Sequence, residues 1–244
     1  MNIIILTPKD KTDENIYSLT DNRANHILNI LKSNRKDIIE IGLLNGKKGK
    51  AEIIETDKGK VKLKILKLEE QKVTKLHVDI ICALPRPQTL KKILTTIATM
   101  GVSNLYLIRS SKVEKSFFQS TLLKKENYTK YLLEGLSQGK RTNLPNIFIH
   151  KRFKQFIENN FSNNVNGVVK LLADIESKKY LNKLKVENKE KYLIAIGPEG
   201  GWTEYETNFM KQNGFIDFKL SQNILRVETA ITAALAQLEL INFK

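Results

Sequence analysis

The stretch Tyr192-Leu193-Ile194-Ala195-Ile196-Gly197-Pro198-Glu199-Gly200-Gly201-Trp202-Thr203-Glu204 predicts a buried strand, a glycine-rich loop and the start of a helix. The apolar run 192–196 is typical of a buried strand. Thr203 and Glu206 have the spacing of a capping box, which marks a helix N-terminus. The glycines between strand and helix let backbone approach a ligand closely. Such a unit indicates an α/β sheet, whose ligands bind beyond the carboxyl ends of the strands.

Strand and helix patterns alternate from about residue 75 to the end of the chain. This alternation predicts a parallel sheet with helices on both faces. The expected strands are 76–84, 103–108, 147–149, 167–173, 192–196 and 215–220. The expected helices are 88–100, 115–138, 153–160, 203–213 and 227–240.

The N-terminal part of the chain has a different pattern. A short amphipathic helix at 23–31 is followed by strands expected at 37–44, 51–56 and 61–68. Turn signals, Asn45-Gly46 and Asp57-Lys58-Gly59, separate these strands. The pattern predicts a small, basic, mostly antiparallel β module, with polar residues 69–75 as a linker. We therefore expect two domains, 1–72 and 73–244.

Composition narrows the class of protein. Hydrophobic residues make up 41% and charged residues 27% of the 244 residues, which is typical of a globular chain. The net charge of +15 favours a polyanionic partner such as nucleic acid, although a Lys-, Asn- and Ile-rich codon bias contributes to it. Cys82 is the only cysteine, so neither an internal disulfide nor a cysteine-based zinc site is expected. We expect no metal, no membrane span and no signal peptide, which predicts a cytoplasmic protein.

A second polar segment, 220–230, follows the strand expected at 215–220. It would line one crevice with the loop after 192–196 if their two strands are neighbours. The chain lacks a P-loop ending and a GxGxxG turn, which disfavours ATP and dinucleotides. Arg226 is conspicuous because Arg is scarce here, although an ion pair with Glu228 or Glu199 would also explain it. Without a nucleophile or metal cluster, an enzyme must position two reactants, and methyl transfer from S-adenosylmethionine suits this.

Four segments together carry a resemblance: 196–203, 224–230, the run Glu134-Gly135-Leu136-Ser137-Gln138-Gly139-Lys140-Arg141 that ends at Pro145, and 26–31 with the strands after it. They resemble the RsmE family of 16S ribosomal RNA uridine N3-methyltransferases, in the SPOUT superfamily, over essentially the whole chain. The resemblance implies a SPOUT-type α/β domain with a deep trefoil knot, preceded by a small PUA-like β-barrel that binds RNA.

The resemblance also implies S-adenosylmethionine as cofactor, a homodimer, and 16S rRNA of the small ribosomal subunit as partner. Arg226 would stabilise charge on the uracil oxygens. Glu199 or Glu228 would accept the N3 proton. The sequence leaves open which carboxylate acts, and whether Glu199 only holds its turn.

Further site residues are expected in two groups. Those for the cofactor are Leu172, Ile196, Gly197, Pro198, Gly200, Gly201, Leu220, Ser221, Asn223, Ile224, Leu225 and Thr229. Those for RNA are Arg23, Lys47, Lys48, Lys50, Arg86, Arg109 and Arg141.

The chain departs from the family pattern at four positions. Thr96 and Thr99 replace a usual Lys and Glu, Ser221 a usual Gly, and Val227 a usual Thr. Two alternative functions stay open: an RNA-binding or assembly factor without catalysis, and a methyltransferase of this superfamily that acts on another RNA, such as tRNA.

Overall fold

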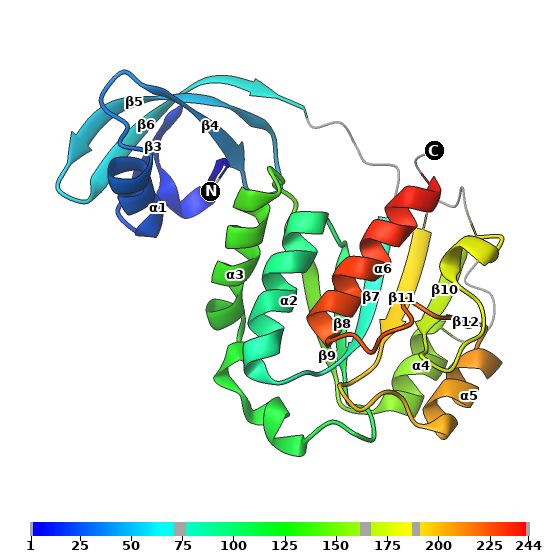
Figure 1. Cartoon of the computed structure of the whole chain (residues 1–244). Helices are drawn as coiled ribbons and strands as arrows, with labels where there is room; N and C mark the ends of the chain where they lie inside the picture. Colours follow the sequence, from blue (N-terminus) through cyan, green and yellow to red (C-terminus); the bar gives the residue numbers. More distant parts are fainter. Residues whose placement is uncertain (1, 71–76, 162–166, 187–190, 243–244) are drawn as a thin grey trace.

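The structure is a computed structural model that describes residues 2–70, 77–161, 167–186 and 191–242. It contains two six-stranded sheets, one in each part of the chain (Figure 1). Within the described ranges, no helix is long and apolar enough to cross a membrane.

The N-terminal sheet is curled and mostly antiparallel, as predicted (Figure 1). Its strand order is β1-β4-β5-β6-β3-β2, and only β1 and β4 pair in parallel. The strands are β1 Ile4–Leu6, β2 Lys11–Asp13, β3 Ile16–Leu19, β4 Ile38–Leu43, β5 Lys48–Asp57 and β6 Lys60–Glu69. The expected helix at 23–31 forms as α1, Asn22–Asn25, followed by a π-helical turn, His26–Ile30. Strands β1 to β3 were not predicted, because three or four residues are too few to show a periodic pattern.

The C-terminal sheet is entirely parallel, which confirms the alternation read from the sequence. Its order is β12-β10-β11-β7-β8-β9. The strands are β7 His77–Ala83, β8 Asn104–Ile108, β9 Asn146–His150, β10 Val168–Ala173, β11 Lys191–Ile196 and β12 Ile216–Phe218. Strand β10 lies between β11 and β12, so the strands that precede the two polar segments are not neighbours.

Helices cover both faces of this sheet, as expected (Figure 1). On one face α2, Pro87–Met100, packs between α3, Lys125–Gln138, and α6, Val227–Asn242. On the other face lie α4, Phe153–Phe161, and α5, Glu204–Gln212. The prediction of helix across 115–124 was wrong. Short 3-10 turns form there instead, because Ser120 and Lys124 have extended backbone and the Ser120 hydroxyl accepts a hydrogen bond from Leu122 N–H.

The first strand belongs to two hydrophobic cores at once. Ile4 and Leu6 of this segment lie in the core of the N-terminal sheet, whereas Ile3 and Ile5 lie in the core beneath α2, α3 and α6. This division follows from the alternation of side chains along a strand. All four side chains are nearly inaccessible to solvent.

Hydrogen bonds reinforce the junction between the two parts. Ser137 O accepts hydrogen bonds from Asn2 N–H and Ile3 N–H at 3.1 and 3.2 Å, and the Ser137 hydroxyl donates to Ile3 O. The buried Thr142 hydroxyl donates to Gly46 O at 2.6 Å, and Leu144 N–H donates to the Asn45 side chain at 2.8 Å. The segment 134–145 therefore joins the two sheets. The expected boundary between residues 72 and 73 lies outside the described residues and stays a prediction.

Candidate functional site

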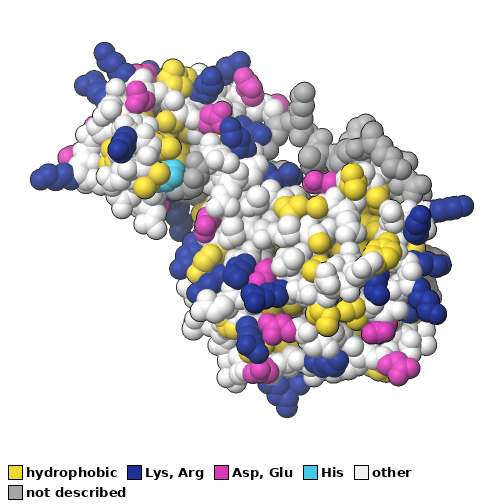
Figure 2. All heavy atoms as spheres, in the orientation of Figure 1, with side chains coloured by type: hydrophobic (Ala, Val, Ile, Leu, Met, Phe, Trp, Pro, Cys, Tyr) yellow, Lys and Arg dark blue, Asp and Glu magenta, His cyan; other side chains and the backbone are white. Residues whose placement is uncertain are grey.

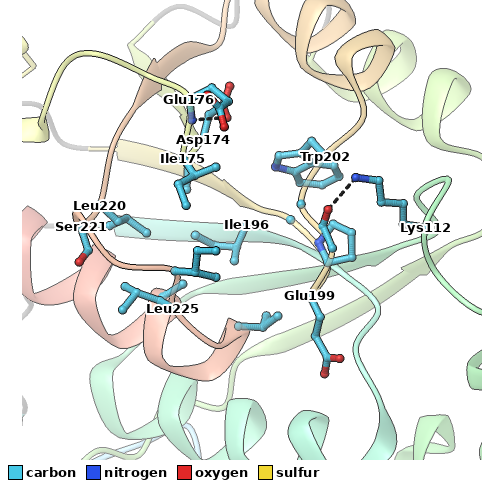
Figure 3. Close-up of a pocket in the computed structure, with 18 of the residues that line it drawn as sticks. Lys112, Asp174, Ile175, Glu176, Ile196, Glu199, Trp202, Leu220, Ser221 and Leu225 are labelled. Carbon is cyan, nitrogen blue, oxygen red and sulfur yellow. Dashed lines mark hydrogen bonds between the residues drawn. The ribbon is translucent and has the colours of Figure 1, made fainter.

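A cavity of about 510 Å³ opens at the carboxyl edge of the C-terminal sheet (Figure 3). Three loops form most of it, one after each of β10, β11 and β12, together with the first turn of α6 and Lys112 from the loop after β8. Its volume lies in the usual range for small-molecule sites. The lining residues are Lys112, Ala173, Asp174, Ile175, Glu176, Ile196, Gly197, Pro198, Glu199, Gly200, Gly201, Trp202, Leu220, Ser221, Asn223, Ile224, Leu225, Val227 and Ala230.

The glycine loop after β11 is a tight turn. Gly201 N–H donates to Pro198 O at 2.8 Å, and Gly201 has a φ of +70°, which favours glycine. An added Cβ on Gly197 would lie 3.1–3.2 Å from the Trp202 ring, so the indole packs directly against this glycine. The loop therefore presents backbone on one side and an aromatic wall on the other.

The predicted capping box at the start of α5 is confirmed, and it is buried. Glu206 is 1% exposed, and one carboxylate oxygen accepts from both Thr203 N–H and the Thr203 hydroxyl at 2.9 Å. The other carboxylate oxygen accepts from Ser111 N–H at 2.7 Å. Glu206 thereby ties the loop after β8 to the end of the glycine loop.

The loop after β10 was missed, although the rule that ligands bind at carboxyl ends applies to its strand as well. Asp174 N–H donates to Phe218 O at 3.0 Å, which joins this loop to the end of β12. Glu176 N–H donates to the Asp174 carboxylate at 3.1 Å and closes a local turn. The signal available in the sequence was the polar run directly after the strand expected at 167–173.

Ten of the twelve residues expected for the cofactor line the cavity. Leu172 does not, because its side chain is buried on the opposite face of the sheet with α4 and α5. Thr229 is exposed on α6, where Val227 and Ala230 face the cavity. The lining residues absent from the expected set are Lys112, Ala173, Asp174, Ile175, Glu176, Trp202, Val227 and Ala230.

The three residues expected in catalysis occupy different positions. Glu199 lines the cavity and forms an ion pair with Arg86 at 3.6 Å. Glu228 lies outside the lining and pairs with Lys92 at 3.3 Å. Arg226 is exposed, and its side chain forms no ion pair or hydrogen bond with any described residue. The alternative explanation of Arg226, an ion pair with either glutamate, is therefore not realised in this structure.

Arg23, expected at the RNA surface, is largely enclosed. Its side chain is 16% exposed and binds Asp10 and Asp21 at 2.7 Å, and it also donates to Ile5 O. Burial disfavours the charged guanidinium, but the hydrogen bonds to Asp10 and Asp21 outweigh this and raise the pKa of Arg23. Arg23 thus stabilises the N-terminal module, and little of its guanidinium remains exposed to bind a phosphate.

The other residues expected to contact RNA are spread over both parts of the chain. Lys and Arg side chains project from the rim of the N-terminal module (Figure 2). Lys47 pairs with Glu70 at 2.7 Å, Lys48 donates to Lys140 O at 3.1 Å, and Lys50 is exposed. Arg109 is half-buried directly after β8, and Arg86 forms the ion pair with Glu199.

Arg141 lies at the α2–α3 contact and is half-buried. Its guanidinium packs against Gly101, where an added Cβ would lie 2.1 Å from it. Burial lowers the pKa of Arg141, with a smaller opposing effect from Glu239. A structural role therefore accounts for much of this side chain.

The departures from the family pattern are accommodated locally. The Thr99 hydroxyl donates to Thr95 O at 2.9 Å and lies 3.1 Å from Gly135 O, so it sits where α2 and α3 touch. Ser221 lines the cavity, and its hydroxyl accepts from Asn223 N–H at 3.1 Å. Val227 adds an apolar group to the wall. In the part of the chain that the structure describes, no group of His, Cys, Asp and Glu side chains could hold a metal ion.

Comparisons with known proteins agree with this architecture. A family model described as an RNA methyltransferase domain matches residues 72–239, and one described as an RNA methyltransferase PUA domain matches residues 19–66. Ribosomal RNA small subunit methyltransferase E 1 of Borreliella burgdorferi is 34% identical over 236 residues, covering 96% of this chain and 95% of that protein. Ribosomal RNA small subunit methyltransferase E of Treponema pallidum is 30% identical, covering 91% of this chain and 84% of that protein.

A solved structure shares the fold over the full length. It is a ribosomal RNA small subunit methyltransferase E from Neisseria gonorrhoeae bound to S-adenosyl methionine. Its TM-score is 0.79 at 20% identity, and the match covers 99% of this chain and 100% of that one.

Proposed function

Because this chain belongs to the ribosomal RNA small subunit methyltransferase E family, we propose that it transfers a methyl group from S-adenosylmethionine to N3 of a uridine in 16S rRNA. The product would be 3-methyluridine in the small ribosomal subunit. The observation that carries the proposal is the cavity formed by the three loops at the carboxyl edge of the parallel sheet.

The residues of the cavity fit S-adenosylmethionine. Apolar side chains such as Ile196, Leu220 and Leu225 suit the adenine ring, and the backbone of the glycine loop offers hydrogen-bonding groups. The carboxylates of Asp174 and Glu176 suit hydroxyl and ammonium groups. When bound, the cofactor supplies a methyl group on an activated leaving group. We retain the deep trefoil knot around this site as part of the proposal.

The protein's own contribution is positioning and charge. Arg226 lies in the chain between Leu225 and Val227, which line the cavity, and its guanidinium pairs with no described residue. This position suits it to stabilise negative charge on the uracil oxygens. Glu199 is the carboxylate of the two candidates that lines the cavity, and its side chain extends away from Trp202 (Figure 3). We assign it the acceptance of the N3 proton, from a uridine that enters on that side.

The partners follow from the same proposal. The target uridine must be unstacked to reach a cavity of this kind. Exposed lysines of the N-terminal module, Lys50 among them, would contact phosphates. We propose a homodimer that completes the site near the subunit interface, and a cytoplasmic location, where ribosomal subunits are assembled.

Methyl transfer can be measured directly. The protein is incubated with methyl-labelled S-adenosylmethionine and, in turn, 30S subunits, free 16S rRNA and tRNA, and the product nucleoside is identified by mass spectrometry. We expect 3-methyluridine in 16S rRNA or in 30S subunits. Label in tRNA alone would overturn the substrate, and cofactor binding without transfer to any RNA would favour a non-catalytic factor.

Arg226→Ala separates chemistry from binding. The rate of single-turnover methylation should fall by roughly 10²–10³, the usual cost of removing one transition-state contact, while cofactor affinity is retained. Arg152→Ala, at an exposed arginine beside α4, is the control. An unchanged single-turnover rate in the Arg226 variant would remove the proposed role.

A further inference from the structure

The loop after β8 contacts the glycine loop itself through the side chain of Lys112. Lys112 Nζ donates to Gly200 O at 2.6 Å (Figure 3). An added Cβ on Gly200 would lie 3.2 Å from Lys112 Cδ, so the lysine stem lies against this glycine. Lys112 is also the only basic residue in the lining of the cavity among the described residues.

The backbone on either side of Lys112 is fixed. On one side, Ser111 N–H donates to the buried Glu206 carboxylate. On the other side, Val113 is buried in the core of the C-terminal sheet, and its N–H donates to Ser110 O at 3.1 Å. A lysine held at both neighbours loses less conformational entropy when it binds than a lysine on a free loop does.

The hydrogen bond lies where the glycine loop has least support of its own. The turn pairs Pro198 O with Gly201 N–H, which leaves the Gly200 carbonyl pointing out of the turn. Glycines on both sides of that carbonyl make its peptide plane easy to rotate. A donor on the carbonyl oxygen fixes that plane, and with it the backbone that faces the cavity.

We propose that Lys112 is a positioning residue that holds the glycine loop in the shape that binds the cofactor. The inference rests on the proposed function, since it names S-adenosylmethionine as the ligand. Lys112 acts through the Gly200 carbonyl, and its effect falls on cofactor affinity more than on folding, because the side chain is largely exposed.

Three variants test this role. Lys112→Met keeps the aliphatic stem and removes the donor, and Lys112→Arg keeps a charged donor. Lys115→Met is the matched control, because Lys115 is exposed nearby and has no hydrogen bond or ion pair with the described residues. Cofactor affinity is measured by calorimetric titration with S-adenosylmethionine. We expect Lys112→Met to weaken binding about tenfold, equivalent to ~1.4 kcal/mol, and Lys112→Arg to restore most of it.

A second readout does not depend on the cofactor. Trp202 is the only tryptophan of the chain and follows the glycine loop directly, so its fluorescence reports on the loop. We expect acrylamide to quench Trp202 more strongly in Lys112→Met than in Lys115→Met, with unchanged unfolding by urea.

The outcomes are distinguishable. If Lys112→Met matches Lys115→Met in both affinity and quenching, Lys112 does not position the loop. The same conclusion follows if Lys112→Arg is as weak as Lys112→Met. If the wild-type protein itself shows no saturable heat with S-adenosylmethionine, the proposed function fails, and the quenching comparison still decides whether Lys112 holds the loop.

Discussion

Replacing Glu206 by Gln is a small chemical change, but it should destabilise the protein strongly. The carboxylate is buried and accepts three hydrogen bonds, two from Thr203 on one oxygen and one from Ser111 on the other. Gln has nearly the same shape but only one acceptor oxygen. In either orientation its NH₂ group faces a backbone N–H, of Ser111 or of Thr203, and a donor then meets a donor.

The magnitude follows from those contacts. A hydrogen bond to a charged group contributes about 1.5–3 kcal/mol, and a buried donor left without an acceptor costs about 1–3 kcal/mol. Since one oxygen still accepts, we expect a net loss of about 2–4 kcal/mol in the free energy of unfolding. For a chain of this length that lowers the melting temperature by about 5–15 °C.

The assay is thermal and urea unfolding of Glu206→Gln beside Glu204→Gln. Glu204 is the exposed first residue of the same helix, so its substitution removes the same charge from the same helix end. That control should cost about 0.3–1 kcal/mol, the usual contribution of a charge near a helix terminus. If the two variants unfold within about 0.5 kcal/mol of each other, the buried hydrogen bonds do not carry the stability assigned to them.

Three further predictions concern residues outside the cavity. Burial raises the pKa of Cys82 to about 12, so a thiol reagent should label Cys82 only after denaturation. The difference in the free energy of urea unfolding between the wild type and Cys82→Ala gives the stabilising contribution of the thiol. This contribution should be complete below about pH 8.5 and decline as the pH rises towards 12. Gly135→Ala should lose about 1–3 kcal/mol in urea unfolding despite a better helix propensity, because its Cβ would lie 2.2 Å from Thr95 O; a gain in stability would show that α2 and α3 separate freely. Lys170→Met should lose about 1.5–3 kcal/mol in the same assay, since buried Lys170 donates to Phe161 O and Asn213 O where α4 and α5 end; wild-type stability would refute that estimate.

The elements of the C-terminal sheet could be predicted because their signals are local. Buried strands appear as short apolar runs, and the helix after the glycine loop carries its own capping box at Thr203 and Glu206. Gly101 follows the helix expected at 88–100 and ends it with a φ of +77°, a backbone conformation that favours glycine. Such signals need no knowledge of which strands pair.

Spatial order could not be predicted in the same way. The position of β10 between β11 and β12 depends on long-range pairing, and no local pattern encodes it. Asp174 and Glu176 were missed, although they belong to a polar run directly after a predicted strand, because the place of their loop beside the other two depends on that pairing. The contact of Lys112 with Gly200 was missed for the same reason, since it joins residues that are far apart in the chain.

The shared first strand links the order of synthesis to the order of folding. Ile3 and Ile5 are synthesised long before α6, yet they belong to the same core as that helix. The N-terminal module can close around Ile4 and Leu6 early, but the other side of the same strand must wait for α2 and α3. A shortened protein that begins at β7 would therefore lack Ile3 and Ile5, which belong to the core of its own sheet. The proposed RNA binding by the N-terminal module is for this reason better tested by point substitutions of its exposed lysines than by removing the module.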